Sequence, residues 1–114
     1  MNKVELLAPA GNYSKFKTAL YFGADAVYIG GKDFSLRAFS DNFSDEEIEK
    51  AVKEAHVKNV KIYVTVNIFA RNYDFDKAAE YFRFLERVNV DAVLITDPGL
   101  ISICKKVAPN LKIH

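Results

Sequence analysis

The stretch ADAVYIGG at Ala24–Gly31 recurs as VDAVLITD at Val90–Asp97. In each copy an aspartate, Asp25 or Asp91, precedes a short apolar run and follows a segment of helical periodicity. We therefore predict that each copy enters a β-strand and that its aspartate has a structural role in the turn. A third run, KIYVTVNIF at 61–69, is rich in β-branched and aromatic residues and predicts another strand.

The rest of the chain alternates in the same way. Helical periodicity predicts helices at 12–24, 44–59, 74–89 and 98–110. Short apolar runs predict two further strands at 4–11 and 111–114. Ser44 followed three residues later by Glu47 predicts a capping box at the start of the second helix. Regular alternation with nearly continuous apolar strands predicts a parallel sheet with right-handed crossovers.

Two parallel α/β architectures fit this order, a small doubly wound sheet and part of an eight-unit (β/α) barrel. Alternate strand positions distinguish them. One phase is branched and apolar: Val27, Ile29, Ile62, Val64, Val66, Val93 and Ile95. The opposite phase is mixed polar: Glu5, Leu7, Tyr28, Gly30, Tyr63, Thr65, Asn67, Leu94 and Thr96. A doubly wound sheet carries helices on both faces and needs both phases apolar, so we favour a partial TIM-like barrel.

The chain holds about four and a half (β/α) units, whereas a whole barrel takes about 250 residues. A sheet of this size cannot close, and its polar phase and both edges would face water. We therefore expect residues 1–114 to be the N-terminal half of a (β/α)-barrel domain, truncated at the fifth strand. The partner that would close it is the remainder of its own barrel, or a second copy in a homodimer of half-barrels.

Composition constrains function only loosely. Hydrophobic residues make up 50% of the 114 residues and the formal net charge is +1, so the charge balance does not indicate nucleic acid or an acidic membrane as a partner. One cysteine excludes an internal disulfide and fits a reducing compartment. No apolar run approaches the roughly 20 residues of a membrane span, and the N-terminal apolar run is too short for a signal peptide. We expect a cytoplasmic protein with no membrane partner.

Ligands of parallel α/β folds bind at the carboxyl ends of the strands. The longest loop there contains Gly30 and Gly31, which let a ligand approach the backbone. It also contains Arg37, which would clamp a carboxylate or phosphate, or pin the loop through a salt bridge. Asn67 lies on the inward phase near the end of its strand and would either fix a loop or orient a substrate.

For three other candidate residues, the sequence favours a structural role over a catalytic one. Asp97 precedes Pro98, as an N-cap precedes proline at the first helical position. Glu5 lies inward near the start of the first strand, and we expect it to pair with a neighbouring Lys or Tyr. Cys104 is interpreted as a small buried hydrophobe. The sequence contains no triad, clear carboxylate pair or metal cluster, so we assign no catalytic residue and expect no metal or cofactor in this segment.

The order of the motifs ELLAPAG, GADAVYIGG, FSLRA, NFS, KIYVTVNI, VDAVLITDPG and PNLKIH resembles the N-terminal half of the collagenase-like peptidase family, U32. The resemblance covers nearly the whole chain. It implies a larger enzyme with a barrel-like first domain, acting as a collagenase-like protease, in hydroxylation of transfer or ribosomal RNA, or in ubiquinone synthesis. The RNA-modifying and ubiquinone members carry an iron–sulfur cluster on cysteines that would lie beyond residue 114, and Cys104 does not match them.

The resemblance implies either a peptide or an RNA substrate, and it transfers pocket-forming positions without catalytic assignments. These positions are Glu5, Pro9, Gly11, Gly30, Gly31, Arg37, Asn67, Asp97 and Gly99. The segment alone is expected to be inactive. The alternative is a non-catalytic α/β binding module that recognises an anionic ligand or a partner chain through GGKDFSLRAF at 30–39.

Overall fold

The structure, a computed structural model, describes residues 5–31, 43–66 and 75–114. Strands and helices alternate within these ranges: β1 (Leu7–Pro9), α1 (Tyr13–Tyr21), β2 (Ala26–Gly30), α2 (Asp45–Val57), β3 (Lys61–Thr65), α3 (Phe75–Arg87), β4 (Ala92–Leu94) and α4 (Pro98–Val107). The strands are parallel and lie in the order β1-β2-β3-β4, which confirms the predicted parallel sheet. A doubly wound sheet reverses its strand order at a switch point, and this sheet does not. An isolated parallel bridge pairs Val93 with Ile113 beside β4, where the sequence predicts the fifth strand.

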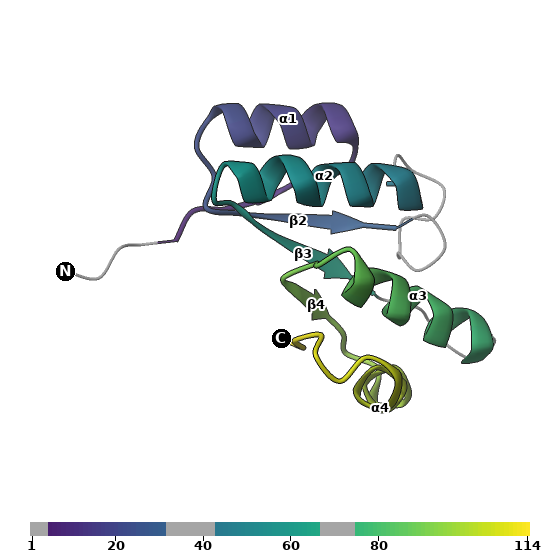
Figure 1. Ribbon diagram of the computed structural model, residues 1–114. Helices are drawn as coiled ribbons and strands as arrows, with labels where there is room; N and C mark the ends of the chain where they lie inside the picture. The colour runs from purple at the N-terminus through teal and green to yellow at the C-terminus, as the bar shows by residue number, and fades with distance from the viewer. Residues whose placement is uncertain (1–4, 32–42, 67–74) are drawn as a thin grey trace.

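The helices cover one face of the curved sheet (Figure 1). They pack on the branched apolar strand phase, and all seven residues of that predicted phase belong to the main hydrophobic core. The opposite face, here called the helix-free face, carries a separate cluster of strand residues alone: Ala26, Tyr63 and Ala92, with Tyr28 and Leu94 packed against them. The predicted division of the strand phases is confirmed, and it is the arrangement of a barrel wall with its interior uncovered.

Three turns between a helix and the next strand share one geometry. Gly23, Asn59 and Asn89 adopt the left-handed conformation, with φ of 80°, 63° and 67°. In each turn the residue after it donates its N–H to the carbonyl five positions back, and these bonds run from Ala24, Val60 and Val90 to Ala19, Ala55 and Leu85. This is the Schellman motif, which satisfies the last carbonyls of a helix. Because the three turns share this geometry, β2, β3 and β4 each enter the sheet in the same orientation relative to the preceding helix.

The two echoed aspartates tie each strand entry to the neighbouring strand. Asp25 Oδ2 accepts a hydrogen bond from Leu6 N at 2.7 Å. Asp91 Oδ2 accepts one from Ile62 N at 2.7 Å and lies 2.8 Å from His56 Nε2. These carboxylates therefore have the predicted structural role, and they act by fixing each strand entry to the neighbouring strand.

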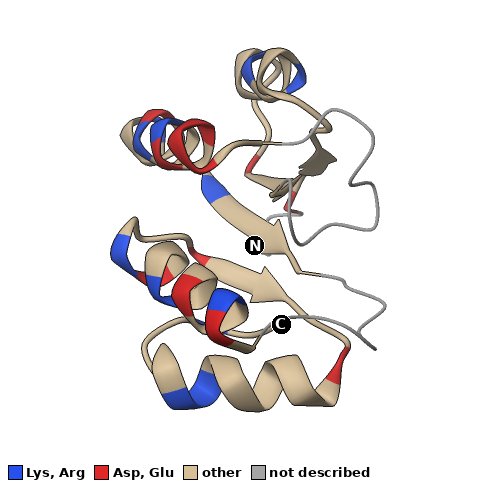
Figure 2. Ribbon diagram, turned by 90° about the vertical axis from the view of Figure 1, so that its right-hand side faces the viewer, with Lys and Arg blue, Asp and Glu red and all other residues tan. Residues whose placement is uncertain are grey.

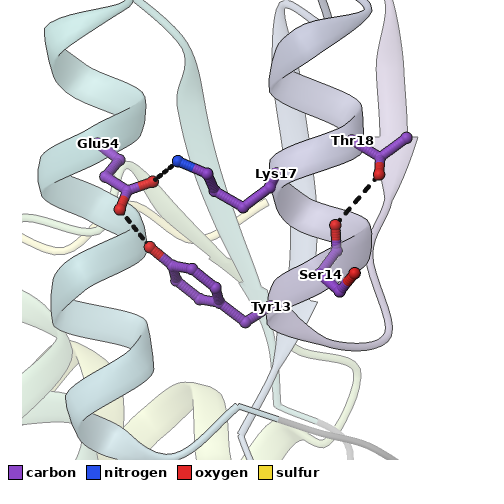
Figure 3. Close-up of polar contacts among 5 residues, drawn as sticks. All are labelled: Tyr13, Ser14, Lys17, Thr18 and Glu54. Atoms are coloured by element: carbon purple, nitrogen blue, oxygen red, sulfur yellow. Dashed lines mark hydrogen bonds and ion pairs between the residues drawn. The ribbon is translucent and has the colours of Figure 1, made fainter.

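A polar network joins α1 to α2 on the outer surface (Figure 3). The Tyr13 hydroxyl donates a short hydrogen bond to Glu54, and Lys17 Nζ lies 2.9 Å from the other Glu54 oxygen. The hydrogen bonds from Tyr13 and then Lys17 lower the pKa of the Glu54 carboxyl. Burial, followed by the bond to Glu54, raises the pKa of Tyr13, so the phenol stays a donor.

We expect Glu54→Gln to destabilise the fold by about 1 kcal/mol at neutral pH, because the charged acceptor of both bonds is lost. Folding lowers the pKa of Glu54 from 4.5, so its contribution is present above that value and disappears as the pH falls through the lower folded-state pKa. Urea unfolding of both proteins across the acid range measures the difference. A gap in unfolding free energy that stays constant with acidification would contradict this role for the carboxylate.

Candidate functional site

The carboxyl edge of the sheet is the candidate site, because ligands of parallel α/β folds bind there. Two of its predicted polar residues, Arg37 and Asn67, lie outside the described residues. The described part of the edge consists of the carboxyl ends of β1, β2, β3 and β4, the segment that resumes at Phe43, and the start of α4. What the structure establishes about this edge is how its backbone is held.

Gly30 and Gly31 are held by backbone pairing and packing. Gly30 pairs with Thr65 of β3, and its carbonyl accepts the Phe43 N–H at 2.9 Å. Gly31 forms a parallel bridge with Phe43. A Cβ on Gly31 would lie 2.2 Å from Tyr81 Oη, so the space that this glycine leaves is filled by a side chain of α3. Packing within the protein by itself accounts for a glycine at position 31.

Tyr81 did not emerge as a functional candidate from the sequence, although a signal exists. It lies three residues after Ala78 and one before Phe82, which places it on the buried side of α3. Its side chain is 8% exposed. The residue packs α3 against Gly31, directly after the end of β2.

Asp97 caps α4. Its Oδ1 accepts a hydrogen bond from Leu100 N at 3.0 Å, and Pro98 and Gly99 form the first helical positions, which is the capping role that the Asp-Pro sequence predicts. At the other end of the edge, Pro9 closes β1, and Gly11 lies exposed just before α1. Pro9 therefore lies in a strand and Gly11 in the bend after it, whereas Asp97 and Gly99 lie in the cap and first turn of a helix.

An aromatic group occupies the helix-free face. The Tyr63 hydroxyl donates to Glu5 Oε1 at 3.4 Å, and the Tyr63 ring lies 5.6 Å from that of Tyr28 and 5.2 Å from that of His114. Glu5 thus has the tyrosine partner that was expected for it. Burial, followed by the Glu5 charge, raises the pKa of Tyr63, so its phenol remains protonated. The group places hydrogen-bond donors and acceptors on the helix-free face.

The one cysteine is a core residue. Cys104 is fully buried in the main core, and burial raises the pKa of its thiol to about 11. Iron–sulfur clusters are ligated by thiolates, and this environment disfavours the thiolate. Within residues 5–31, 43–66 and 75–114, no group of three or more His, Cys, Asp or Glu side chains could hold a metal ion. The described residues therefore do not fit a cluster site.

The same fold occurs in solved barrel enzymes. The chain aligns with the HMG-CoA lyase from Brucella melitensis at a TM-score of 0.67 and 17% identity, covering 96% of this chain and 46% of that one. It aligns with an HpcH/HpaI aldolase from Desulfitobacterium hafniense at 0.60 and 12% identity, covering 95% and 39%. Both are TIM-barrel enzymes, so the fold is that of a partial (β/α) barrel. At these identities the likeness concerns the fold alone.

Family membership follows from sequence. The family model described as peptidase family U32 matches residues 11–114, and the chain belongs to that family. It is 48% identical to tRNA hydroxylation protein P1 of Bacillus subtilis, over 98% of this chain and 26% of that protein. It is 38% identical to an uncharacterized protease of Methanocaldococcus jannaschii, over 100% and 28%. It is 34% identical to the 23S rRNA 5-hydroxycytidine C2501 synthase of Escherichia coli, over 99% and 17%. The chain spans about a quarter of the length of the first two relatives.

The names of the relatives cover two activities, RNA hydroxylation and peptide cleavage. The relatives named for RNA hydroxylation support that branch of the family over the peptidase label. Across the described part of the chain, no helix is long and apolar enough to cross a bilayer.

Proposed function

We propose that residues 1–114 supply the first half of the barrel of a cytoplasmic RNA hydroxylation enzyme. The observation that carries this proposal is the 48% identity to a tRNA hydroxylation protein across nearly the whole chain. The relative with a protease name is less similar, at 38%. The ribosomal RNA relative widens the substrate class from transfer RNA to RNA in general.

In this proposal the helix-free face becomes the barrel interior. Its cluster contains no helix residue, and Leu7 at the outer edge of the sheet is 41% exposed. The remainder of the barrel would bury both, and the Tyr63–Glu5 pair would then lie inside, below the carboxyl edge. A homodimer of half-barrels would cover the same face, and a size measurement of the isolated chain distinguishes the two arrangements.

The family resemblance implies an iron–sulfur cluster for RNA hydroxylation. We propose that its ligands are cysteines beyond residue 114, because the buried Cys104 thiol does not suit a cluster. The role of this segment is then to shape and bind. Its strands form the wall, and its caps and turns hold the loops at the carboxyl edge.

A chimera tests the proposal. Residues 1–114 replace the matching segment of tRNA hydroxylation protein P1, in Bacillus subtilis lacking both P1 and its second tRNA hydroxylation protein, P2. We expect mass spectrometry to show restored tRNA hydroxylation, because the segment supplies the missing barrel half. Unaltered P1 is the positive control, and P1 without the segment is the negative control. A chimera that accumulates in folded form yet leaves the tRNA unhydroxylated would refute the proposal.

The second candidate is a peptidase, which the family label and the archaeal relative favour. The same purified chimera is incubated with gelatin. Cleavage of gelatin without hydroxylation of tRNA would replace the RNA proposal by the peptidase.

A further inference from the structure

A groove with a volume of about 510 Å³ opens on the outer surface between α2 and the end of α3. Valines line part of it: Val52 and Val57 come from α2, and Val88 follows α3. Val57 is 88% exposed, so it offers an accessible apolar surface beside the buried Val52 and Val88. The groove lies at the C-terminal ends of these helices, and thus at the edge of the sheet opposite the candidate site.

Cationic side chains stand beside this apolar floor. Lys53 and Arg87 line the groove and are exposed, and neither forms an ion pair with the residues that the structure describes. The Arg87 guanidinium lies 5.6 Å from the centre of the Phe84 ring, which restricts its orientation. His56 also lines the groove and is paired with Asp91 at 2.8 Å. Among the described residues that line this groove, Glu49 alone is acidic, so their excess charge is positive.

Basic residues at helix ends are common, because they complement the helix dipole. Figure 2 shows the pattern on α4, which has an acidic cap and Lys105 and Lys106 in its last turn. Lys53 differs, because it lies a full turn before the end of α2. The carbonyls of Ala55 and Leu85, near the ends of α2 and α3, already accept hydrogen bonds from Val60 and Val90. The helix dipoles of α2 and α3 therefore do not explain why both Lys53 and Arg87 lie unpaired, among the described residues, at the same groove.

We infer that this groove binds the phosphodiester backbone of the RNA substrate, at a point remote from the reaction site. Lys53 and Arg87 would contact phosphate oxygens, and the exposed Val57 side chain would contact ribose or base surfaces. A volume of about 510 Å³ suits a ligand of one or two nucleotides. This inference rests on the proposed function, which makes RNA, rather than an acidic peptide, the anionic occupant.

The test measures binding of the 114-residue chain to an unmodified tRNA transcript by fluorescence anisotropy over a range of salt concentrations. The double variant Lys53→Glu/Arg87→Glu is expected to bind about tenfold more weakly and to lower the salt slope by roughly 1.5, as two phosphate contacts are lost. The matched control is Lys105→Glu/Lys106→Glu, which alters the formal charge identically, from +1 to −3, at another helix end. The control is expected to weaken binding by less than about threefold.

Several outcomes would overturn the inference. Equal losses in the two variants would mean that net charge alone governs binding. No binding by the unaltered chain, or displacement of tRNA by an acidic peptide at equal concentration, would also exclude an RNA groove. If Lys53→Glu/Arg87→Glu unfolds, as judged by circular dichroism, the milder Lys53→Gln/Arg87→Gln variant decides. Hydroxylation of tRNA by the chimera is measured separately. If the chimera is active and neither double variant reduces that activity, the groove inference is wrong and the proposed function stands. If the chimera is inactive but the groove variant still weakens tRNA binding, the proposed function is wrong and the groove inference stands.

Discussion

Replacing Gly31 with alanine is expected to lower the free energy of unfolding by roughly 2–3 kcal/mol. The new Cβ would lie 2.2 Å from Tyr81 Oη and 3.0 Å from Tyr81 Cζ. Real Cβ atoms do not approach so closely, so the buried tyrosine or the end of β2 must move. Urea unfolding of the two proteins measures the loss.

Two further variants show whether Tyr81 is the cause. Tyr81→Phe in the Gly31→Ala background removes the closest atom and should recover part of the stability. Gly99→Ala is the matched glycine control, and it should be neutral or slightly stabilising because Gly99 lies in the first turn of α4. If Gly31→Ala unfolds at the same urea concentration as the unaltered chain, α3 does not pack on this glycine.

Asp91→Ala is expected to cost about 2–3 kcal/mol, because Ile62 N and His56 Nε2 both lose their partner. The equivalent Asp25→Ala should cost about 1 kcal/mol, since the Leu6 N–H that loses a partner is exposed and can bond to water. Thermal unfolding of both variants measures the ranking. A double-mutant cycle with His56→Ala separates the two bonds of Asp91, and additivity in that cycle would show that the His56 contact contributes nothing.

The fold was predictable because its signal is local and periodic. The alternation of apolar and polar strand positions, such as Ile62 and Tyr63, distinguished the helix-covered face of the sheet from the helix-free face. The repeated sequence around Asp25 and Asp91 marked the starts of two equivalent strands. The Ser44–Glu47 capping box was also predictable, and it is present. Each of these features depends on residues close together in the chain.

The features that sequence did not predict join distant segments. Contact between Gly31 and Tyr81, the bond from Tyr13 to Glu54, and the groove between Lys53 and Arg87 all depend on how one helix lies against another element. No periodicity encodes those distances. The sequence predicted that Gly31 lets a ligand approach the backbone, whereas in the structure the Tyr81 side chain of α3 fills the space beside this glycine.

The central claim is that the helix-free face is the interior of a barrel, and Leu7→Lys tests it most directly. The same substitution is made in the isolated chain and in the chimera with the Bacillus protein, and the midpoint of thermal unfolding is compared. Leu7 is 41% exposed in the chain, so lysine should be tolerated there. In the chimera the lysine would be removed from water inside the barrel, and the loss of its hydration should cost several kcal/mol even if it pairs with Glu5 on the same face. Val57→Lys, at a side chain 88% exposed on the outer surface, is the control for both contexts. A large loss for Leu7→Lys in the chimera alone is the predicted result, and an equally small shift in both proteins would contradict a barrel interior.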